Sequence, residues 1–225
     1  MSTIESEPGQ GSSIAEPRAL DLVIFDADGV LFDSTESNTS YYNAIYAEVG
    51  EPPLSPEEEK AGVFMSALQV FEMRAAGDQE RMARMREVAR AIDFTPFFKL
   101  LRPPLALRSF LAEIKRRYRI ALATNRSATV PGLIEHLGLG GVFDAVASAR
   151  DKVRPKPAPD ILTLCLQRAD AAAARAVYVG DSETDRIAAM AAGTRFIGVG
   201  ARIEHEPRIE RLEQLPALLE RAFGT

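Results

Sequence analysis

The amino-acid sequence predicts an α/β fold, a doubly wound parallel sheet with a small helical cap domain inserted after its first strand. Three observations support this prediction. Short apolar runs alternate with stretches of helical periodicity over residues 119–200, which is typical of parallel strands joined by crossover helices. A further apolar run lies far ahead of them, at residues 22–25. The segment between them, residues 34–103, contains helical stretches and no convincing strand.

Each predicted strand is a short run of apolar residues. The first, LVIF, lacks polar alternation, as expected where helices cover both faces of a sheet. The other four runs are RIALAT (119–124), FDAVAS (143–148), AVYVG (176–180) and RFIGVG (195–200). For a doubly wound sheet we expect the spatial order fifth, fourth, first, second, third.

Three predicted helices separate the later strands. The first is expected to have Ser127 as its cap, Pro131 in its early turns and Gly138 at its end. The second begins at the prolines near Ala158, and the third runs from about residue 184 to 193. The helices are therefore placed to carry the chain back across the sheet between consecutive strands.

The segment before these strands is predicted to be a cap made of helices. Its helical stretches are residues 35–50, 55–77 and 78–94. In the last stretch one apolar face is formed by Met82, Met85, Ala89 and Ile92. The prediction thus divides the chain into a flexible lead (1–18), a catalytic core (19–33 and 104–225) and the cap (34–103), with hinges near residues 34–36 and 102–104.

Composition excludes several classes of protein. With 46% apolar residues the chain can bury a core, and its net charge of −5 argues against nucleic acid as the main partner. No apolar run approaches the length of a membrane span, and residues 1–17 lack the features of a secretory signal. We therefore expect a cytoplasmic protein. Cys165 is the one cysteine and lies at helical spacing with leucines, which favours a buried, inert thiol.

Acidic residues gather at the ends of two predicted strands. Asp26 and Asp28 follow the first strand directly, and Asp181 and Asp185 follow the fourth. In doubly wound sheets, ligands bind beyond the carboxyl ends of the strands, where the strand order reverses. Several carboxylates converging there cannot all stay ionised unaided, and a hard divalent cation such as Mg²⁺ would relieve their repulsion.

Neutral and cationic groups follow other strand ends. Thr124 and Asn125 end the second strand, and Lys156 stands between two prolines just before a predicted helix. Hydroxyl, amide and ammonium groups of this kind suit an anion. Together with a metal ion they predict a site for a phosphoryl group.

Four motifs, DADGVLFDS, ATN, KPAPD and GDSETD, occur in this order over roughly residues 20–200. In this order the chain resembles the haloacid dehalogenase superfamily. More closely, it is similar to the superfamily's helical-cap phosphatases, the phosphoglycolate-phosphatase and β-phosphoglucomutase-like branch. The resemblance implies a Rossmann-like core and an Mg²⁺-dependent phosphoric monoester hydrolase.

The resemblance also implies roles for individual residues. Asp26 would be the nucleophile that forms an aspartyl-phosphate, and Asp28 would be the general acid and then the general base. The phosphoryl oxygens would be held by Thr124, Asn125 and Lys156. Mg²⁺ would be bound by Asp26, the backbone carbonyl of Asp28 and Asp181. Asp185 would support these ligands from behind or bind the metal directly.

The cap sequence bears on the substrate. Where relatives that cleave phosphonates carry a lysine, and phosphohexomutases a nearby arginine, this chain has the apolar residues Val63, Phe64 and Met65. This favours hydrolysis of a small phosphomonoester, phosphoglycolate-like or a sugar phosphate. The alternatives are a β-phosphoglucomutase-like phosphotransferase, a dehalogenase or phosphonatase, and a catalytically silent regulatory protein.

We expect a small phosphorylated metabolite as partner, no nucleic acid or membrane, and a monomer or homodimer. The role of Arg126, beside the ATN motif, is left open.

Overall fold

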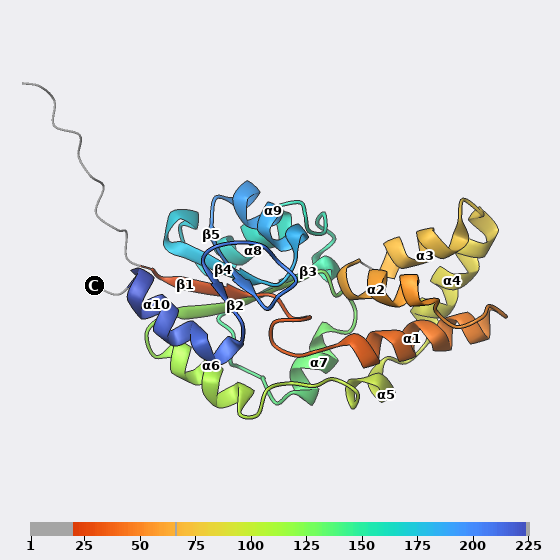
Figure 1. Ribbon diagram of the computed structural model, residues 1–225, viewed down its shortest axis with the longest axis horizontal. Helices are drawn as coiled ribbons and strands as arrows, with labels where there is room; N and C mark the ends of the chain where they lie inside the picture. Colours follow the sequence, from red (N-terminus) through yellow and green to blue (C-terminus); the bar gives the residue numbers. More distant parts are fainter. Residues whose placement is uncertain (1–19, 66, 224–225) are drawn as a thin grey trace, which may run out of the picture.

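The computed structural model describes residues 20–65 and 67–223, except for the side chains of residues 63 and 64. The predicted flexible lead, residues 1–18, lies outside this part of the chain. Figure 1 shows a sheet with helices on both faces and a further group of helices at one end. Within the described residues, no helix combines the length and the apolar character needed to cross a membrane.

Six parallel strands form the sheet. In their spatial order they are β3 (Ala145–Ser148), β2 (Arg119–Thr124), β1 (Leu22–Phe25), β4 (Ala176–Gly180), β5 (Arg195–Val199) and β6 (Arg208–Ile209). The first five confirm the predicted order, with β1 between β2 and β4. The sixth strand was not predicted, because two residues are too few to give a periodic signal.

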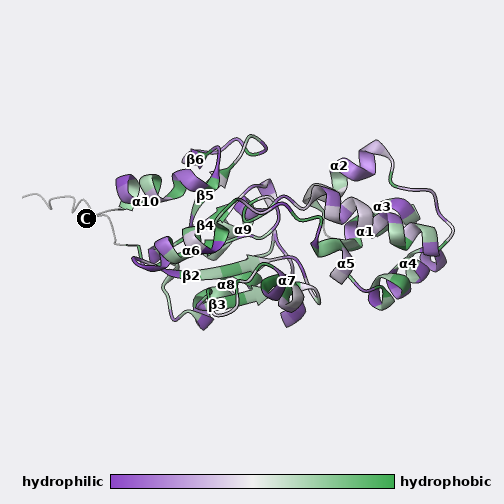
Figure 2. Ribbon diagram, turned by 90° about the horizontal axis from the view of Figure 1, so that it is seen from below, coloured by the Kyte–Doolittle hydropathy of each residue, from purple (hydrophilic) through white to green (hydrophobic). Residues whose placement is uncertain are grey.

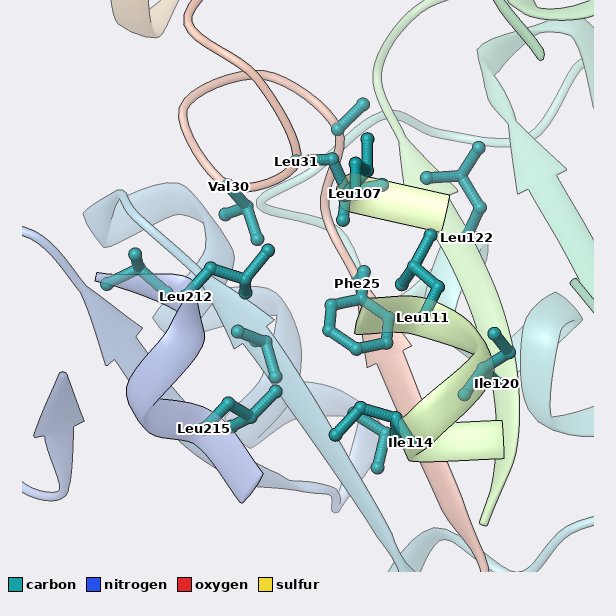
Figure 3. Packing of buried hydrophobic residues seen from close by; sticks show 14 of the residues in the cluster. Phe25, Val30, Leu31, Leu107, Leu111, Ile114, Ile120, Leu122, Leu212 and Leu215 are labelled. Carbon is teal, nitrogen blue, oxygen red and sulfur yellow. The ribbon is translucent and has the colours of Figure 1, made fainter. Parts of the chain in front are cut away.

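The two faces of the sheet bury different side chains, because successive strand residues point in opposite directions. Val23 and Phe25 belong to one apolar cluster, and Leu22 and Ile24 to another. The first cluster lies under α6 (Leu107–Lys115), α7 (Val130–His136) and α10 (Leu215–Phe223), and the second under α8 (Asp160–Arg168) and α9 (Glu183–Ala192). Figure 3 shows the first cluster, with Phe25 facing leucines of α6.

The predicted start of α7 is wrong by a few residues. Thr129, and not Ser127, holds the N-cap position, and neither side chain caps the helix. Pro131 explains the late start, because proline lacks an N–H and fits the first turn of a helix. By contrast, α9 begins after a capping box formed by Ser182 and ends at Gly193, close to the predicted bounds.

The helices between β1 and α6 share an apolar cluster of their own. They are α1 (Thr35–Glu48), α2 (Pro56–Phe64), α3 (Ala67–Ala75), α4 (Gln79–Ala91) and α5 (Thr95–Phe98). Met82 and Met85 are buried in this cluster, with Ala89 and Ile92 packed against it. The stretch predicted as one helix over residues 55–77 is two helices, and α5 was not predicted. Figure 2 shows this group beyond one end of the sheet.

The two connections between the sheet and this helical group run side by side. The Asp33 N–H donates to the Arg102 carbonyl (3.0 Å), and the Arg102 N–H donates to the Asp33 carbonyl (2.9 Å). This pair fixes the start of α1 next to the end of the segment that follows α5. The division into core and cap, with hinges at these crossings, stays a prediction.

We predict that Leu111→Ala lowers the free energy of unfolding by about 2–5 kcal/mol, because it leaves a cavity between α6 and the sheet. Leu111 has no exposed surface. Urea denaturation measures the change. The matched control is Leu105→Ala, since Leu105 is fully exposed, and it should change stability by less than about 0.5 kcal/mol. Equal losses in the two variants would contradict the assignment of α6 to the core.

Candidate active site

A pocket of about 170 Å³ lies where the carboxyl ends of β1, β2 and β4 meet the helical group. On the sheet side it is lined by Asp26, Asp28, Thr124, Arg126, Lys156 and Asp181. On the other side it is lined by residues of the cap segment, among them Asn38, Tyr42, Met65 and Phe94. The predicted site residues other than Asp185 therefore line one cavity, at the edge of the sheet where they were expected.

The ammonium group of Lys156 is at the centre of the site. Its Nζ lies 2.7 Å from Asp26 Oδ1, 2.7 Å from Asp185 Oδ1 and 2.8 Å from the Tyr178 hydroxyl. Burial alone would lower the pKa of Lys156, but the charges of Asp185 and Asp26 raise it above its ordinary value. Lys156 is thus a buried, permanently charged cation beside Asp26.

Tyr178 is a site residue that the sequence analysis missed. Its hydroxyl accepts from Lys156 and donates to Asp185 Oδ1 (2.9 Å). Tyr178 lies inside the apolar run of β4, so it has the pattern of a core aromatic residue. The sequence signal that could have revealed it is its place three residues before Asp181, at the carboxyl end of the strand.

Asp26 directly follows β1 and is held against the neighbouring strand. Its N–H donates to the Val179 carbonyl (2.9 Å), and its side chain is only 9% exposed. Burial raises the pKa of Asp26 well above its ordinary value, Lys156 opposes this rise, and the charges of Asp185 and Asp181 add to it. The negative charge at this position is therefore only partly balanced by the protein.

Three carboxylates could hold a metal ion. One oxygen each from Asp26, Asp181 and Asp185 lies within 4.8 Å of the other two. Burial is the main reason that the pKa of Asp181 rises to about 6, which Arg202 opposes and Asp185 reinforces. The oxygen-only donors and the unrelieved repulsion fit a hard divalent cation. The chain also allows close approach here, because Gly29 has a φ of +74° and a Cβ at its position would overlap Asp181.

Asp185 differs from the other two acids, because the protein already uses both of its oxygens. Oδ1 accepts from Lys156 and Tyr178, while Oδ2 accepts from the Asp181 N–H (3.2 Å), the Ser182 N–H (3.1 Å) and the Ser182 hydroxyl (2.5 Å). Burial would raise the pKa of Asp185, but Lys156 and these hydrogen bonds hold it below its ordinary value. Asp185 is therefore a fixed anion behind the pocket.

The Asp28 carboxylate is not part of this cluster and pairs with Arg126. Arg126 Nε donates to Asp28 Oδ2 (2.8 Å), and Nη2 donates to Asp28 Oδ1 (2.7 Å). Burial would raise the pKa of Asp28, but the charge and hydrogen bonds of Arg126 keep it below its ordinary value. The sequence analysis left the role of Arg126 open. Its contact with Asp28 joins segments that are far apart in the chain, so the sequence pattern does not reveal it.

Thr124 and Asn125 order the chain around Lys156 and Arg126. The Thr124 hydroxyl accepts from the Arg126 N–H (3.1 Å). Asn125 contacts the Lys156 backbone twice, accepting from its N–H (2.8 Å) and donating to its carbonyl (3.1 Å). Asn125 thus joins the end of β2 to the loop that carries Lys156. That Thr124, Asn125 and Lys156 bind phosphate stays a prediction.

The cysteine and the two histidines do not line the pocket. Cys165 is buried, as expected, and burial raises its pKa to about 12. His136 stacks on Phe98, and His205 lies edge-on to Phe196. Of the three apolar cap residues noted in the sequence, Met65 lines the pocket. The side chains of Val63 and Phe64 lie outside the described part of the chain.

Comparison with known proteins gives consistent results. The sequence profile of the family described as "Haloacid dehalogenase-like hydrolase" matches residues 23–199. A protein of Dickeya dadantii named "Probable phosphatase IndB" is 33% identical over 194 residues, covering 79% of this chain and 80% of that protein. A phosphoglycolate phosphatase of Pseudomonas savastanoi pv. phaseolicola is 29% identical over 212 residues, covering 88% of this chain and 75% of the relative.

Similarity extends to a solved structure. The crystal structure of a haloacid dehalogenase-superfamily hydrolase of subfamily IA from Geobacter sulfurreducens has a TM-score of 0.72 and 28% identity. The match covers 92% of this chain and 100% of that chain. The match therefore includes the helices between β1 and β2 as well as the sheet.

We predict that Lys156→Met destabilises the metal-free protein by about 3–5 kcal/mol, because it leaves two buried carboxylates without a cation. Urea denaturation in EDTA measures the loss. The matched control is Lys60→Met, since Lys60 is exposed on α2, and it should change stability by less than about 0.5 kcal/mol. A loss below about 1 kcal/mol in Lys156→Met would show that the acids do not depend on this ammonium.

Proposed function

This chain belongs to the haloacid dehalogenase-like hydrolases, and we propose that it is an Mg²⁺-dependent phosphatase that hydrolyses a small phosphomonoester through an aspartyl-phosphate on Asp26. The observation that carries this proposal is the Lys156 ammonium, buried 2.7 Å from Asp26 in a pocket that contains acids suited to a divalent cation. A carboxylate nucleophile beside a fixed cation is what attack on a phosphate dianion requires. The phosphatase names of the relatives support the same reaction.

The nucleophilic step uses Asp26 and Lys156. Asp26 attacks phosphorus, and the bond from phosphorus to the ester oxygen breaks. Lys156 offsets the repulsion between the carboxylate and the phosphoryl oxygens. Thr124 is the last residue of β2, and Asn125 follows it. These two residues complete the proposed contacts to the phosphoryl oxygens.

The metal site is proposed from Asp26, Asp181 and the backbone carbonyl of Asp28, with Asp185 behind them. When bound, Mg²⁺ supplies positive charge that keeps the carboxylates ionised and draws charge from the phosphoryl oxygens. Burial raises the pKa of Asp26 and Asp181, which supports a cation at this position. The protein's own cations leave part of the repulsion unrelieved.

Asp28 is proposed to move protons. It would give a proton to the leaving oxygen in the first step and take one from water in the second. Its carboxylate is bound to Arg126 in this structure, and that contact favours the ionised form. For the first step Asp28 therefore has to leave Arg126 and gain a proton.

The size of the pocket supports a small substrate. A cavity of about 170 Å³ suits a compact phosphomonoester such as phosphoglycolate or a sugar phosphate, and its polar base suits the phosphoryl group. The partner we propose is therefore a small phosphorylated metabolite. A cytoplasmic location, the absence of nucleic-acid and membrane partners, and a monomeric or homodimeric state remain predictions.

The test is release of inorganic phosphate across a panel of small phosphomonoesters, with Mg²⁺ and after chelation with EDTA. We expect turnover with Mg²⁺ only, and a loss of about 10⁴-fold or more in Asp26→Asn, which removes the nucleophile. Asp181→Asn should raise the Mg²⁺ concentration needed for half-maximal activity. Undiminished turnover after chelation would contradict the metal requirement. Turnover that depends on an added sugar bisphosphate would favour the mutase, and halide release the dehalogenase.

A further inference from the structure

Arg126 is a buried cation in the pocket that the proposed phosphatase reaction does not use. We propose that its guanidinium binds a carboxylate of the substrate, so that the enzyme selects phosphorylated hydroxy acids over uncharged phosphate esters. This inference rests on the proposed function and names the substrate class of the same site. It follows from the charges around the pocket, the free edge of the guanidinium and the placement of Asp28.

Arg126 is the pocket cation that could bind a second anionic group of the substrate. Among the described residues that line it, the only cations are Lys156 and Arg126. The Lys156 ammonium already contacts Asp26, Asp185 and Tyr178, and it lies beside the proposed nucleophile, where the phosphoryl group has to bind. A substrate with a second negative group therefore meets Arg126 as the remaining cation of the pocket.

The guanidinium has an edge available for that group. Nε and Nη2 donate to Asp28, and Nη2 also donates to Asn38 Oδ1 (3.1 Å). Nη1 makes no hydrogen bond within residues 20–65 and 67–223. A guanidinium presents five N–H donors in a planar fork that matches a carboxylate. Nη1 can therefore donate to a substrate carboxylate while Nε and Nη2 still donate to Asp28.

The surroundings of Arg126 fix it in place and limit its contact with water. Its guanidinium carbon lies 5.7 Å from the centre of the Phe32 ring and 5.3 Å from that of Phe94. The side chain is 9% exposed. Ionic hydrogen bonds are stronger in such a position than in water. Because Phe94 and Asn38 come from the cap segment, the arginine also joins that segment to the end of β2.

Exchange of partners on Arg126 links substrate selection to Asp28. A substrate carboxylate that binds at Nη1 then competes with the Asp28 carboxylate for the neighbouring donor, Nη2. Asp28 is then released toward the leaving oxygen, where the proposed proton transfer occurs. An uncharged ester cannot compete in this way and leaves Asp28 bound to Arg126. The alternative is that Arg126 only neutralises Asp28, in which case its loss would affect all esters alike.

The experiment compares kcat/KM for 2-phosphoglycolate and ethyl phosphate, which differ mainly in the carboxylate. The wild-type protein should prefer 2-phosphoglycolate by about 10- to 100-fold, the usual effect of hydrogen bonds to a charged group. In Arg126→Gln the preference should fall to within about threefold, because glutamine lacks the charge and the fork. Arg126→Lys should keep part of it. The control is Arg84→Gln, since Arg84 is exposed on α4, and the full preference should remain.

Two outcomes would overturn the inference while the proposed function stands. They are hydrolysis of both esters by the wild-type protein without a preference, and an unchanged preference in Arg126→Gln. If the wild-type protein hydrolyses neither ester, the proposed function is decided by the panel of phosphomonoesters described above. Isothermal titration calorimetry in Mg²⁺ then measures the dissociation constants of the two esters for the same proteins. The ratio of these constants replaces the ratio of kcat/KM values as the test of the inference. If circular dichroism shows that Arg126→Gln does not fold, a full wild-type preference in Arg126→Lys overturns the inference and a reduced preference supports it.

Discussion

The contact between the Lys156 ammonium and the carboxylates of Asp26 and Asp185 is the interaction on which this site depends. A buried carboxylate without a cation is costly, and β1 and β4 each end in acids that the fold brings together. Much of the local structure keeps Lys156 in position: Asn125 holds its backbone, and Tyr178 holds its ammonium. The acids are nevertheless incompletely balanced, as the raised pKa values of Asp26 and Asp181 show. That remaining imbalance is the basis of the proposed Mg²⁺ site.

The order of the strands explains how separate motifs form one site. Because β1 lies between β2 and β4, the loops after these three strands meet at the same edge of the sheet. The insertion between β1 and β2 leaves and returns at this edge, where Asp33 and Arg102 join its two ends. Residues after β1, β2 and β4 line one side of the pocket, and residues of the inserted helices line the other. Arg126 contacts both parts, through Asp28 and Asn38, and is therefore well placed to link recognition to catalysis.

The sequence predicted the sheet well, because buried parallel strands are continuous apolar runs and their order follows from the fold class. It also located Asp26, Asp181 and Lys156 in one site, since each follows a strand end or precedes a helix. It did not locate the start of α7, where Pro131 outweighed the capping preference of Ser127. Neither the pairing of Arg126 with Asp28 nor the contact of Tyr178 with Lys156 was predicted. Both depend on side-chain directions between distant segments, which periodicity and spacing do not encode.

The central claim is that Asp26 is the nucleophile and that Asp28 acts on its phosphorylated form. Mass spectrometry of the intact protein and of its peptides, after rapid acid quench, tests this most directly. The substrate is an aryl phosphate, because its leaving group needs no proton. Asp28→Asn should accumulate one phosphoryl group on the peptide that contains Asp26, since the step that activates water is slowed. Asp26→Asn should carry none. A phosphoryl group on the protein when Asp26 is replaced, or on any other residue, would contradict the account.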